Sequence, residues 1–168
     1  MINIRVFLIT ILIWCSATIS FAAPYAAIVI DTDTGKVLHS ENANTRLHPA
    51  GLTKLATLYA AFEAVETREV DLDAKARISL KAANEELAAL GMREGQRVSI
   101  RDLIRATAIK GANDTSTALA EAISGSEQAF TKRLDETANK LGLSRSTFKN
   151  AHGLTEKGHL PQQVIWHF

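Results

Sequence analysis

The sequence predicts a mixed α+β domain, in which a helical region packs on an antiparallel sheet. Two observations lead to this expectation: a strand-like alternation with a central turn near the N-terminus, and several later segments with apolar residues at helical spacing. Of the 168 residues, 46% are hydrophobic and 22% are charged, which suits one globular domain with a core. No repeat, linker or low-complexity stretch divides the chain.

The first 22 residues have the composition of a secretory signal peptide. An apolar run covers Val6 to Trp14, and the small residues Ser20 and Ala22 follow it. The run is shorter than the roughly 20 residues that cross a membrane. Cleavage after Ala22 leaves an exported domain of residues 23–168, and it removes the single cysteine, so no disulfide is expected.

The charge of the chain is almost balanced. Lysine and arginine number 19 against 18 aspartate and glutamate residues, and no run of like charge stands out. A nucleic acid or an anionic membrane surface would call for a basic patch, so neither is an expected partner.

Residues 26–40 predict a β-hairpin, because two alternating stretches flank the turn-forming residues 31–35. The same turn contains Asp33-Thr34-Gly35, which matches an aspartic-protease motif. That chemistry needs a second carboxylate from a repeat or a symmetric partner, so an aspartic protease acting through Asp33 is a minor alternative. A calcium loop is excluded by the absence of a third oxygen ligand and a closing glutamate.

A long helix is expected from Gly51 to Glu66, with nearly all of one face buried. Its apolar residues at helical spacing are Leu52, Leu55, Ala56, Tyr59, Phe62 and Val65. After it we expect a short strand at 77–80 and a helical segment at 81–89 that ends at Gly91.

Three more helices are expected in the second half of the chain, each with a capping residue before it. They are 99–109 with Ser99 as cap, 115–123 with Asn113 or Asp114 as cap, and 126–141 with Ser126 as cap. Gly111 ends the first of them and Gly142 the last. A short extended segment is expected at 147–150.

No cofactor or metal is expected. The five histidines lie at none of the spacings that helical zinc sites use, and the glycines do not form a phosphate-binding loop.

The segment from His48 to Val65 resembles the S-x-x-K region of the serine-type D-alanyl-D-alanine carboxypeptidases, which are low-molecular-weight penicillin-binding proteins. In that pattern a serine begins a buried helix, and a lysine one turn later takes the serine's proton. Lys54 matches the lysine, whereas Gly51 occupies the place of the nucleophilic serine.

Two further segments carry the resemblance. Residues 110–126 are similar to the family's S-x-N region and the helix after it: Asn113 matches the asparagine, and Gly111 stands in place of the second serine. Residues 149–154 resemble the family's N-x-H-G-L stretch. Together with the hairpin, which resembles the family's opening strands, the resemblance covers about residues 25–155.

The resemblance implies a partial penicillin-binding, β-lactamase-like transpeptidase fold. The family's third motif, K-T-G on a strand that lines the site, has no match, and from about His159 the tail no longer resembles the family. The domain in residues 23–168 is therefore expected to be truncated, with a helical region on an incomplete antiparallel sheet.

The resemblance also implies the chemistry. In the family the serine attacks the D-Ala-D-Ala end of a peptidoglycan stem peptide, and penicillins acylate the same serine. Gly51 has no oxygen, so we expect little or no catalysis, although Lys54 and Asn113 remain. Thr53 is no substitute, because it points about 200° away from residue 51 on a helix. The expected location is the periplasm or the outer face of the inner membrane.

Two other interpretations stay open beside this one. The chain could instead be a non-catalytic module that binds peptidoglycan or a partner protein. Such a module would share its ancestry with the carboxypeptidases and would differ from them only in function. A β-lactamase is a weaker match, because Gly-Ala-Asn113 differs from the Ser-Asp-Asn of that family.

Overall fold

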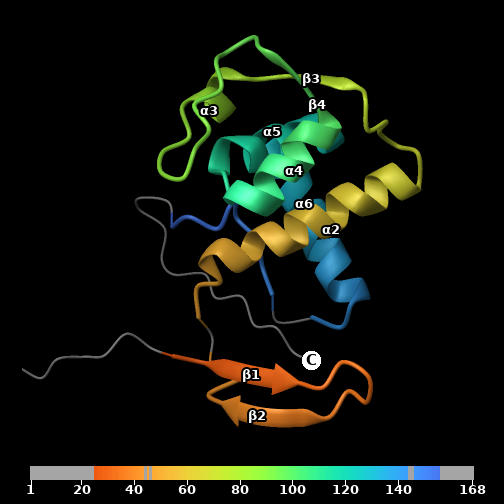
Figure 1. The fold of residues 1–168 in the computed structure, drawn as a ribbon, viewed down its shortest axis with the longest axis vertical. Helices are drawn as coiled ribbons and strands as arrows, with labels where there is room; N and C mark the ends of the chain where they lie inside the picture. Colours follow the sequence, from red (N-terminus) through yellow and green to blue (C-terminus); the bar gives the residue numbers. More distant parts are fainter. Residues whose placement is uncertain (1–24, 44, 46, 144–145, 156–168) are drawn as a thin grey trace, which may run out of the picture.

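The computed structural model describes residues 25–43, 45, 47–143 and 146–155. The expected signal peptide and the tail from His159 lie outside these residues. In chain order the elements are β1 (Ala27–Ile30), β2 (Val37–Glu41), η1 (Ala50–Leu52), α2 (Thr53–Glu66), β3 (Lys75–Arg77), α3 (Leu80–Ala83), β4 (Arg97–Ser99), α4 (Ile100–Lys110), α5 (Asn113–Ser124) and α6 (Glu127–Lys140). The mixed α+β prediction is confirmed, with β1 and β2 at one end of a helical body and β3, β4 and α3 at the other (Figure 1).

The predicted hairpin is present. Strands β1 and β2 pair antiparallel, from Ala27 opposite Glu41 to Ile30 opposite Val37. In the turn between them the Asp31 carboxylate accepts hydrogen bonds from the Thr34 hydroxyl (2.5 Å) and the Thr34 amide (2.8 Å). These bonds lower the pKa of Asp31, the hydroxyl contributing most. The Asp-Thr-Gly sequence therefore builds a turn.

Helix α2 forms as predicted, but the prediction of its buried face was wrong. Its buried residues are small: Thr53, Thr57, Ala60, Ala61 and Ala64. The large side chains on the other side are about half exposed, namely Leu52 (51%), Leu55 (58%), Tyr59 (48%) and Phe62 (55%). The small residues allow α4, α5 and α6 to pack closely against α2, so the helix is apolar on two faces.

Helices α4 and α6 begin and end close to the predicted positions. The Ser99 hydroxyl accepts from the Asp102 amide (3.1 Å), and the Ser126 hydroxyl accepts from the Ala129 amide (3.2 Å), as N-caps do. Gly111 ends α4 in the left-handed conformation, with φ of 61°. The prediction for α5 was wrong at its cap: Ala112 is the N-cap residue, and Asn113 and Asp114 lie in the first turn.

The region between α2 and α4 differs most from the prediction. The strand expected at 77–80 ends at Arg77, because Ser79 instead caps α3 by accepting from the Ala82 amide (3.0 Å). Helix α3 has only four residues, so the helix expected at 81–89 was wrong beyond its first turn. Strand β4, which pairs antiparallel with β3, was not anticipated.

The segment at 147–150, expected to be extended, is also not a strand. It is held in place by side chains of the helical body, since the Phe148 amide donates to the Asp135 carboxylate (2.8 Å).

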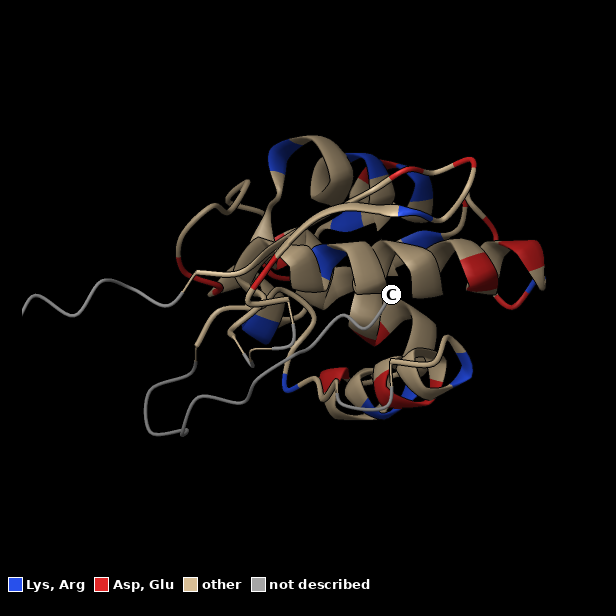
Figure 2. Cartoon of the chain, turned by 90° about the horizontal axis from the view of Figure 1, so that it is seen from below, with Lys and Arg blue, Asp and Glu red and all other residues tan. Residues whose placement is uncertain are grey.

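The core lies among the helices, and α5 is its most buried element, with nine of its twelve residues buried. Leu103, Leu119, Phe130 and Leu134 are among the largest fully buried side chains. Basic and acidic residues occur on the same helices, in agreement with the balanced charge of the sequence (Figure 2). None of the helices in the described part of the chain has both the length and the apolar composition needed to span a bilayer.

Candidate active site

Gly51 lies in the 3-10 turn η1, immediately before α2, and is exposed to solvent. A Cβ atom built on Gly51 would meet no other atom within 4 Å. The preceding residue, Ala50, has a positive φ of 44°, a conformation that costs an L-residue roughly 1 kcal/mol. The turn thus has room for a side chain at position 51 and carries backbone strain beside it.

Lys54 is the second residue of α2, and its side chain reaches residues 152–154, whose sequence His-Gly-Leu we call the HGL segment. Its Nζ donates a hydrogen bond to the carbonyl oxygen of His152 (2.8 Å). Burial lowers the pKa of Lys54 from its usual value of 10.5, because the ammonium form loses hydration. A lysine with a lowered pKa is more often neutral and can accept a proton, which is the role of a general base.

Gly153 makes the contact between the HGL segment and the start of α2 possible. A Cβ atom on Gly153 would stand 1.9 Å from the Ala50 carbonyl oxygen and 2.7 Å from the Thr53 hydroxyl. Its φ of 85° also favours glycine. No other residue fits here without moving the backbone of the turn that carries Gly51.

Asn113 lies at the start of α5 and is 1% exposed. Its Nδ2 donates to the carbonyl oxygens of Glu86 and Leu87 (both 3.0 Å). Its Oδ1 is buried and has no hydrogen-bond partner among the described residues. A buried acceptor without a partner is costly in a folded protein, so this oxygen has unused capacity for one hydrogen-bond donor.

Asp114, the next residue, is 1% exposed and fixes the loop before α4. One carboxylate oxygen accepts from the amides of Leu90 (2.9 Å), Gly91 (3.0 Å) and Met92 (3.3 Å). Together with Asn113 it explains why residues 86–92 form an ordered loop rather than the helix that the sequence suggested.

The second glycine of the expected site, Gly111, ends α4 and donates its amide to the Thr107 carbonyl (3.1 Å). A Cβ atom at this position would also meet nothing within 4 Å. Because its φ is 61°, any other residue here would carry the cost of the left-handed conformation.

A chain of contacts joins the three motif segments. Starting from Lys54, it passes through the backbone of His152 to its side chain, whose Nε2 lies 3.4 Å from Glu85 Oε2. The other oxygen of Glu85 accepts from the Thr117 hydroxyl (2.8 Å), one turn beyond Asn113 in α5. The residues predicted from sequence at Lys54 and Asn113 therefore belong to one connected region of the structure.

No sequence pattern marked Glu85 or Glu127 as part of this region. Glu127 is 3% exposed; its Oε1 accepts from the Ala151 amide (2.8 Å) and lies 3.9 Å from His152 Nε2. Its Oε2 forms an ion pair with Lys81 (2.5 Å). Glu85, Glu127 and His152 bring three potential metal-ligand atoms within 4.8 Å of one another. Because both carboxylates already accept protein hydrogen bonds, the cluster is satisfied as a structural network.

The other hydroxyls near the site are not poised as nucleophiles. Thr53 is 3% exposed, and Ser116 is completely buried and donates its hydroxyl to the Ala112 carbonyl (2.8 Å). Asp33, the centre of the aspartic-protease alternative, lies exposed in the turn of the β1–β2 hairpin.

Comparison with known proteins gives a consistent result. The family model for D-alanyl-D-alanine carboxypeptidases of peptidase family S11 matches residues 16–164. The carboxypeptidase DacF of Bacillus subtilis is 40% identical over 134 residues, which are 80% of this chain and 34% of the relative. DacC of Escherichia coli is 34% identical over 139 residues, or 79% of this chain and 35% of the relative. The chain spans about a third of the length of these curated relatives.

Solved structures agree with the sequence matches. The carboxypeptidase DacD of Francisella tularensis has a TM-score of 0.78 at 32% identity, covering 89% of this chain and 35% of its own. Penicillin-binding protein D2 of Listeria monocytogenes, solved with ampicillin bound, has a TM-score of 0.69 at 28% identity and covers 86% of this chain and 59% of its own. The connected Lys54, Asn113 and His152 segments, the mixed α+β fold and these matches agree: the chain belongs to the peptidase S11 family of D-alanyl-D-alanine carboxypeptidases.

Proposed function

We propose that this chain carries the helical part of a D-alanyl-D-alanine carboxypeptidase site that recognises the end of a peptidoglycan stem peptide but forms no acyl-enzyme. The observation behind this proposal is the turn at the start of α2. Gly51 presents no side chain one turn before Lys54, a lysine that is held by His152 and has a lowered pKa.

The proposed chemistry follows from what each residue retains. Lys54 can accept a proton, and Asn113 offers a buried acceptor oxygen, but Gly51 and Gly111 have no hydroxyl where the family pattern has serine. Loss of the nucleophile in a serine hydrolase lowers turnover by about a million-fold. Because Lys54 and Asn113 are present and the nucleophile is absent, we expect the site to bind the stem peptide without hydrolysing it.

Intact-mass spectrometry with a penicillin tests the loss of the nucleophile. We would place residues 25–155 into B. subtilis DacF instead of its matched segment, and compare this chimera with its Gly51→Ser, Gly111→Ser variant. The chimera is expected to keep its mass, and the double-serine variant to gain the mass of the antibiotic. Gly51→Ala is the matched control, because it adds a Cβ without an oxygen.

Two results would contradict the proposal. An adduct on the unmodified chimera would show that another residue is the nucleophile. A double-serine variant that neither gains mass nor releases D-alanine would show that Gly51 is not the nucleophile position.

The unpartnered Oδ1 of Asn113 supports the recognition half of the proposal, in which the chain serves as a non-catalytic binding module. It predicts that the chimera binds a peptide ending in D-Ala-D-Ala in calorimetry without cleaving it. Lys54→Ala removes the amine of this lysine, whose hydrogen bond to a ligand in the neutral form would be worth about 0.5–1.5 kcal/mol, so affinity should fall roughly twofold to tenfold. No binding by the unmodified chimera would exclude this use.

The proposed location is the periplasm. Export predicts that the protein recovered from a periplasmic extract begins at Ala23, which N-terminal sequencing can read directly. A chain that retains its first 22 residues in the cytoplasm would contradict export.

A further inference from the structure

The antiparallel pair of β3 and β4 carries basic side chains on its outer face. Side chains alternate between the two faces of a strand, and Ala76 and Val98, which lie opposite each other, pack on the core. The other face points to solvent and carries exposed cations at Lys75, Arg77 and Arg97. The pair lies at the end of the molecule opposite the β1–β2 hairpin (Figure 1).

The turn at residues 93–96 leads into β4 and adds a fourth exposed cation, Arg93. The guanidinium of Arg77 lies over this turn, because a Cβ atom built on Gly95 would stand 3.8 Å from Arg77 Nη2. We call β3, β4 and this turn the basic ribbon. It holds four basic residues and one acidic residue, Glu94.

The described part of the chain does not neutralise the basic ribbon. None of its four cations forms an ion pair with a described carboxylate, and the flanking acids are already engaged. Asp73 pairs with Arg101 (3.1 Å), and Asp102 bonds to the capping serine of α4. Arg77 lies directly opposite Arg97, and like charges at opposite positions destabilise a strand pair. The ribbon therefore keeps a self-repelling cluster of positive charge that an anionic partner would relieve.

This cluster is not a run of charge in the sequence. Lys75 and Arg77 are separated from Arg93 and Arg97 by residues 78–92, and strand pairing brings the two pairs together. The net charge of the whole chain is only +1. Positive charge is thus concentrated at one end of a nearly neutral molecule, so an anionic surface would bind it in one orientation.

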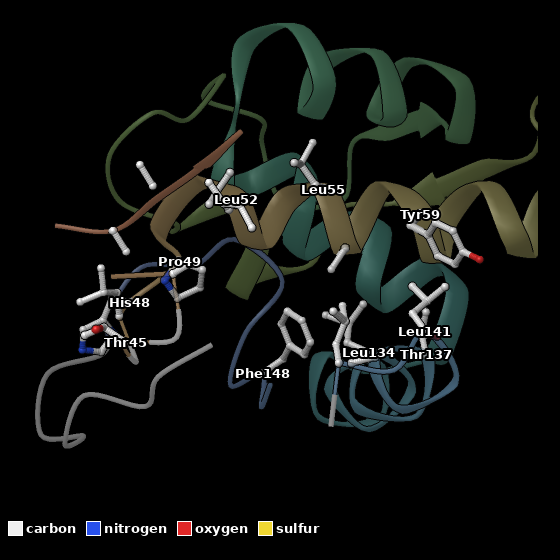
Figure 3. Close-up of a pocket in the computed structure, with 18 residues that line it drawn as sticks. Thr45, His48, Pro49, Leu52, Leu55, Tyr59, Leu134, Thr137, Leu141 and Phe148 are labelled. Carbon is white, nitrogen blue, oxygen red and sulfur yellow. The ribbon is translucent and has the colours of Figure 1, made fainter. Parts of the chain in front are cut away.

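The shape and composition of the basic ribbon decide which anionic partner fits. Its cations stand on the outside of the molecule, where a flat surface can approach them, and none of them lines the apolar pocket beside α2. Figure 3 shows that pocket between Leu55 and Tyr59 of α2 and Phe148. The ribbon has no aromatic residue on which the bases of a nucleic acid would stack. We propose that the basic ribbon docks the protein on the surface of a bilayer that contains anionic phospholipids.

Headgroup phosphates supply the charge that the ribbon lacks. Three of its four cations are arginines, whose planar guanidinium groups bind a phosphate through two parallel hydrogen bonds. Each lysine or arginine near an anionic bilayer raises the binding constant roughly fivefold. Binding through charge without a buried apolar anchor is reversible and weakens with salt. The inference concerns where the protein binds, and it does not depend on whether the Lys54 site recognises a stem peptide.

Co-sedimentation of the whole chain with lipid vesicles tests the docking. Vesicles of phosphatidylglycerol and phosphatidylcholine in equal parts are compared with vesicles of phosphatidylcholine alone. The neutral vesicles report any binding through the apolar run from Val6 to Trp14, which needs no anionic lipid. We expect excess binding to the anionic vesicles that disappears between about 0.1 M and about 1 M salt, because the Debye length falls from about 10 Å to about 3 Å.

Matched substitutions locate the contact. Arg77→Gln combined with Arg97→Gln removes the two opposed cations and should lower the binding constant for anionic vesicles roughly 25-fold. Arg77→Lys combined with Arg97→Lys keeps both charges and should retain most of the binding. The control is Lys132→Gln combined with Lys140→Gln, which removes two exposed charges from α6 and should change binding less than about twofold. Thermal melting should show the ribbon glutamine variant to be at least as stable as the parent protein, because a repulsion is removed.

Four outcomes would overturn the proposal. The first is equal binding to anionic and neutral vesicles, and the second is a ribbon glutamine variant that binds as well as the α6 control. The third is excess binding that survives the high salt concentration, which would show that charge does not hold the protein on the bilayer. The fourth is binding to soluble inorganic polyphosphate without binding to anionic vesicles, which would identify a soluble polyanion as the partner.

Discussion

At the scale of single residues, Gly153 determines how closely the HGL segment approaches the start of α2. Alanine at this position would place a Cβ 1.9 Å from the Ala50 carbonyl oxygen. Overpacking and the positive φ together are expected to lower the free energy of unfolding of Gly153→Ala by about 3 kcal/mol or more, as measured by urea denaturation.

The matched control for that prediction is Gly142→Ala. Gly142 has a similar φ of 79°, but a Cβ there would meet nothing within 4 Å. Gly142→Ala should lower the free energy of unfolding by only about 1 kcal/mol, which is the cost of the left-handed conformation alone. Equal losses in the two variants would contradict the close packing at Gly153.

Lys54 predicts a pH dependence of stability. Because burial lowers its pKa in the folded protein, the unfolded chain binds more protons between the folded-state pKa and about 10.5. The contribution of Lys54 to the free energy of unfolding therefore rises as pH increases through that window. We expect the stability of the parent protein, measured relative to Lys54→Met, to increase as the pH rises toward about 10.5.

Urea denaturation at several pH values measures this difference. Subtracting the free energies of unfolding of Lys54→Met from those of the parent protein at each pH cancels the contributions of the titratable groups that the two proteins share. A difference that falls with pH would mean that the charged form of Lys54 is favoured in the folded state, which is opposite to the effect of desolvation.

At the scale of elements, Glu127 joins α6 to the HGL segment. Glu127→Ala leaves the buried Ala151 amide without its acceptor, so the free energy of unfolding should fall by about 1–3 kcal/mol. Glu127→Gln keeps an acceptor oxygen, so its free energy of unfolding should fall by less than that of Glu127→Ala. The exposed neighbour Gln128, changed to alanine, should stay within about 0.5 kcal/mol of the parent.

Thermal denaturation of the three variants checks the order. If Glu127→Ala were as stable as Gln128→Ala, the buried carboxylate would contribute nothing to holding the HGL segment.

The elements that the sequence predicted well are those with local signals. The caps at Ser99 and Ser126, the hairpin turn at Asp31 and the helix end at Gly111 each depend on residues within a few positions of one another. Their geometry is therefore readable from short stretches of sequence.

The elements that were missed depend on distant partners. The loop at 86–92 is held by Asn113 and Asp114, more than twenty residues later. Glu85 and Glu127 meet His152 from other elements, so no spacing pattern marks them. Apolar periodicity located α2, but it could not show which of two apolar faces the described part of the chain would bury.

At the scale of the whole molecule, the described elements divide into a helical body and a hairpin. Helix α5 packs against four other elements, α2, α3, α4 and α6, and it also contacts β3, whereas β1 and β2 are in extensive contact only with each other. Figure 1 shows the hairpin set apart at one end of the helices. An isolated two-stranded hairpin has marginal stability in water, so the two parts should differ in local stability.

Amide hydrogen exchange measures that difference residue by residue. The amides of α5 are expected to exchange only through global unfolding, because nine of its residues are buried. The paired amides of β1 and β2 should exchange at least a hundredfold faster, through local opening that breaks few apolar contacts. If the hairpin amides were protected as strongly as those of α5, the hairpin would be stably docked on the helical body, and the predicted difference in local stability would be wrong.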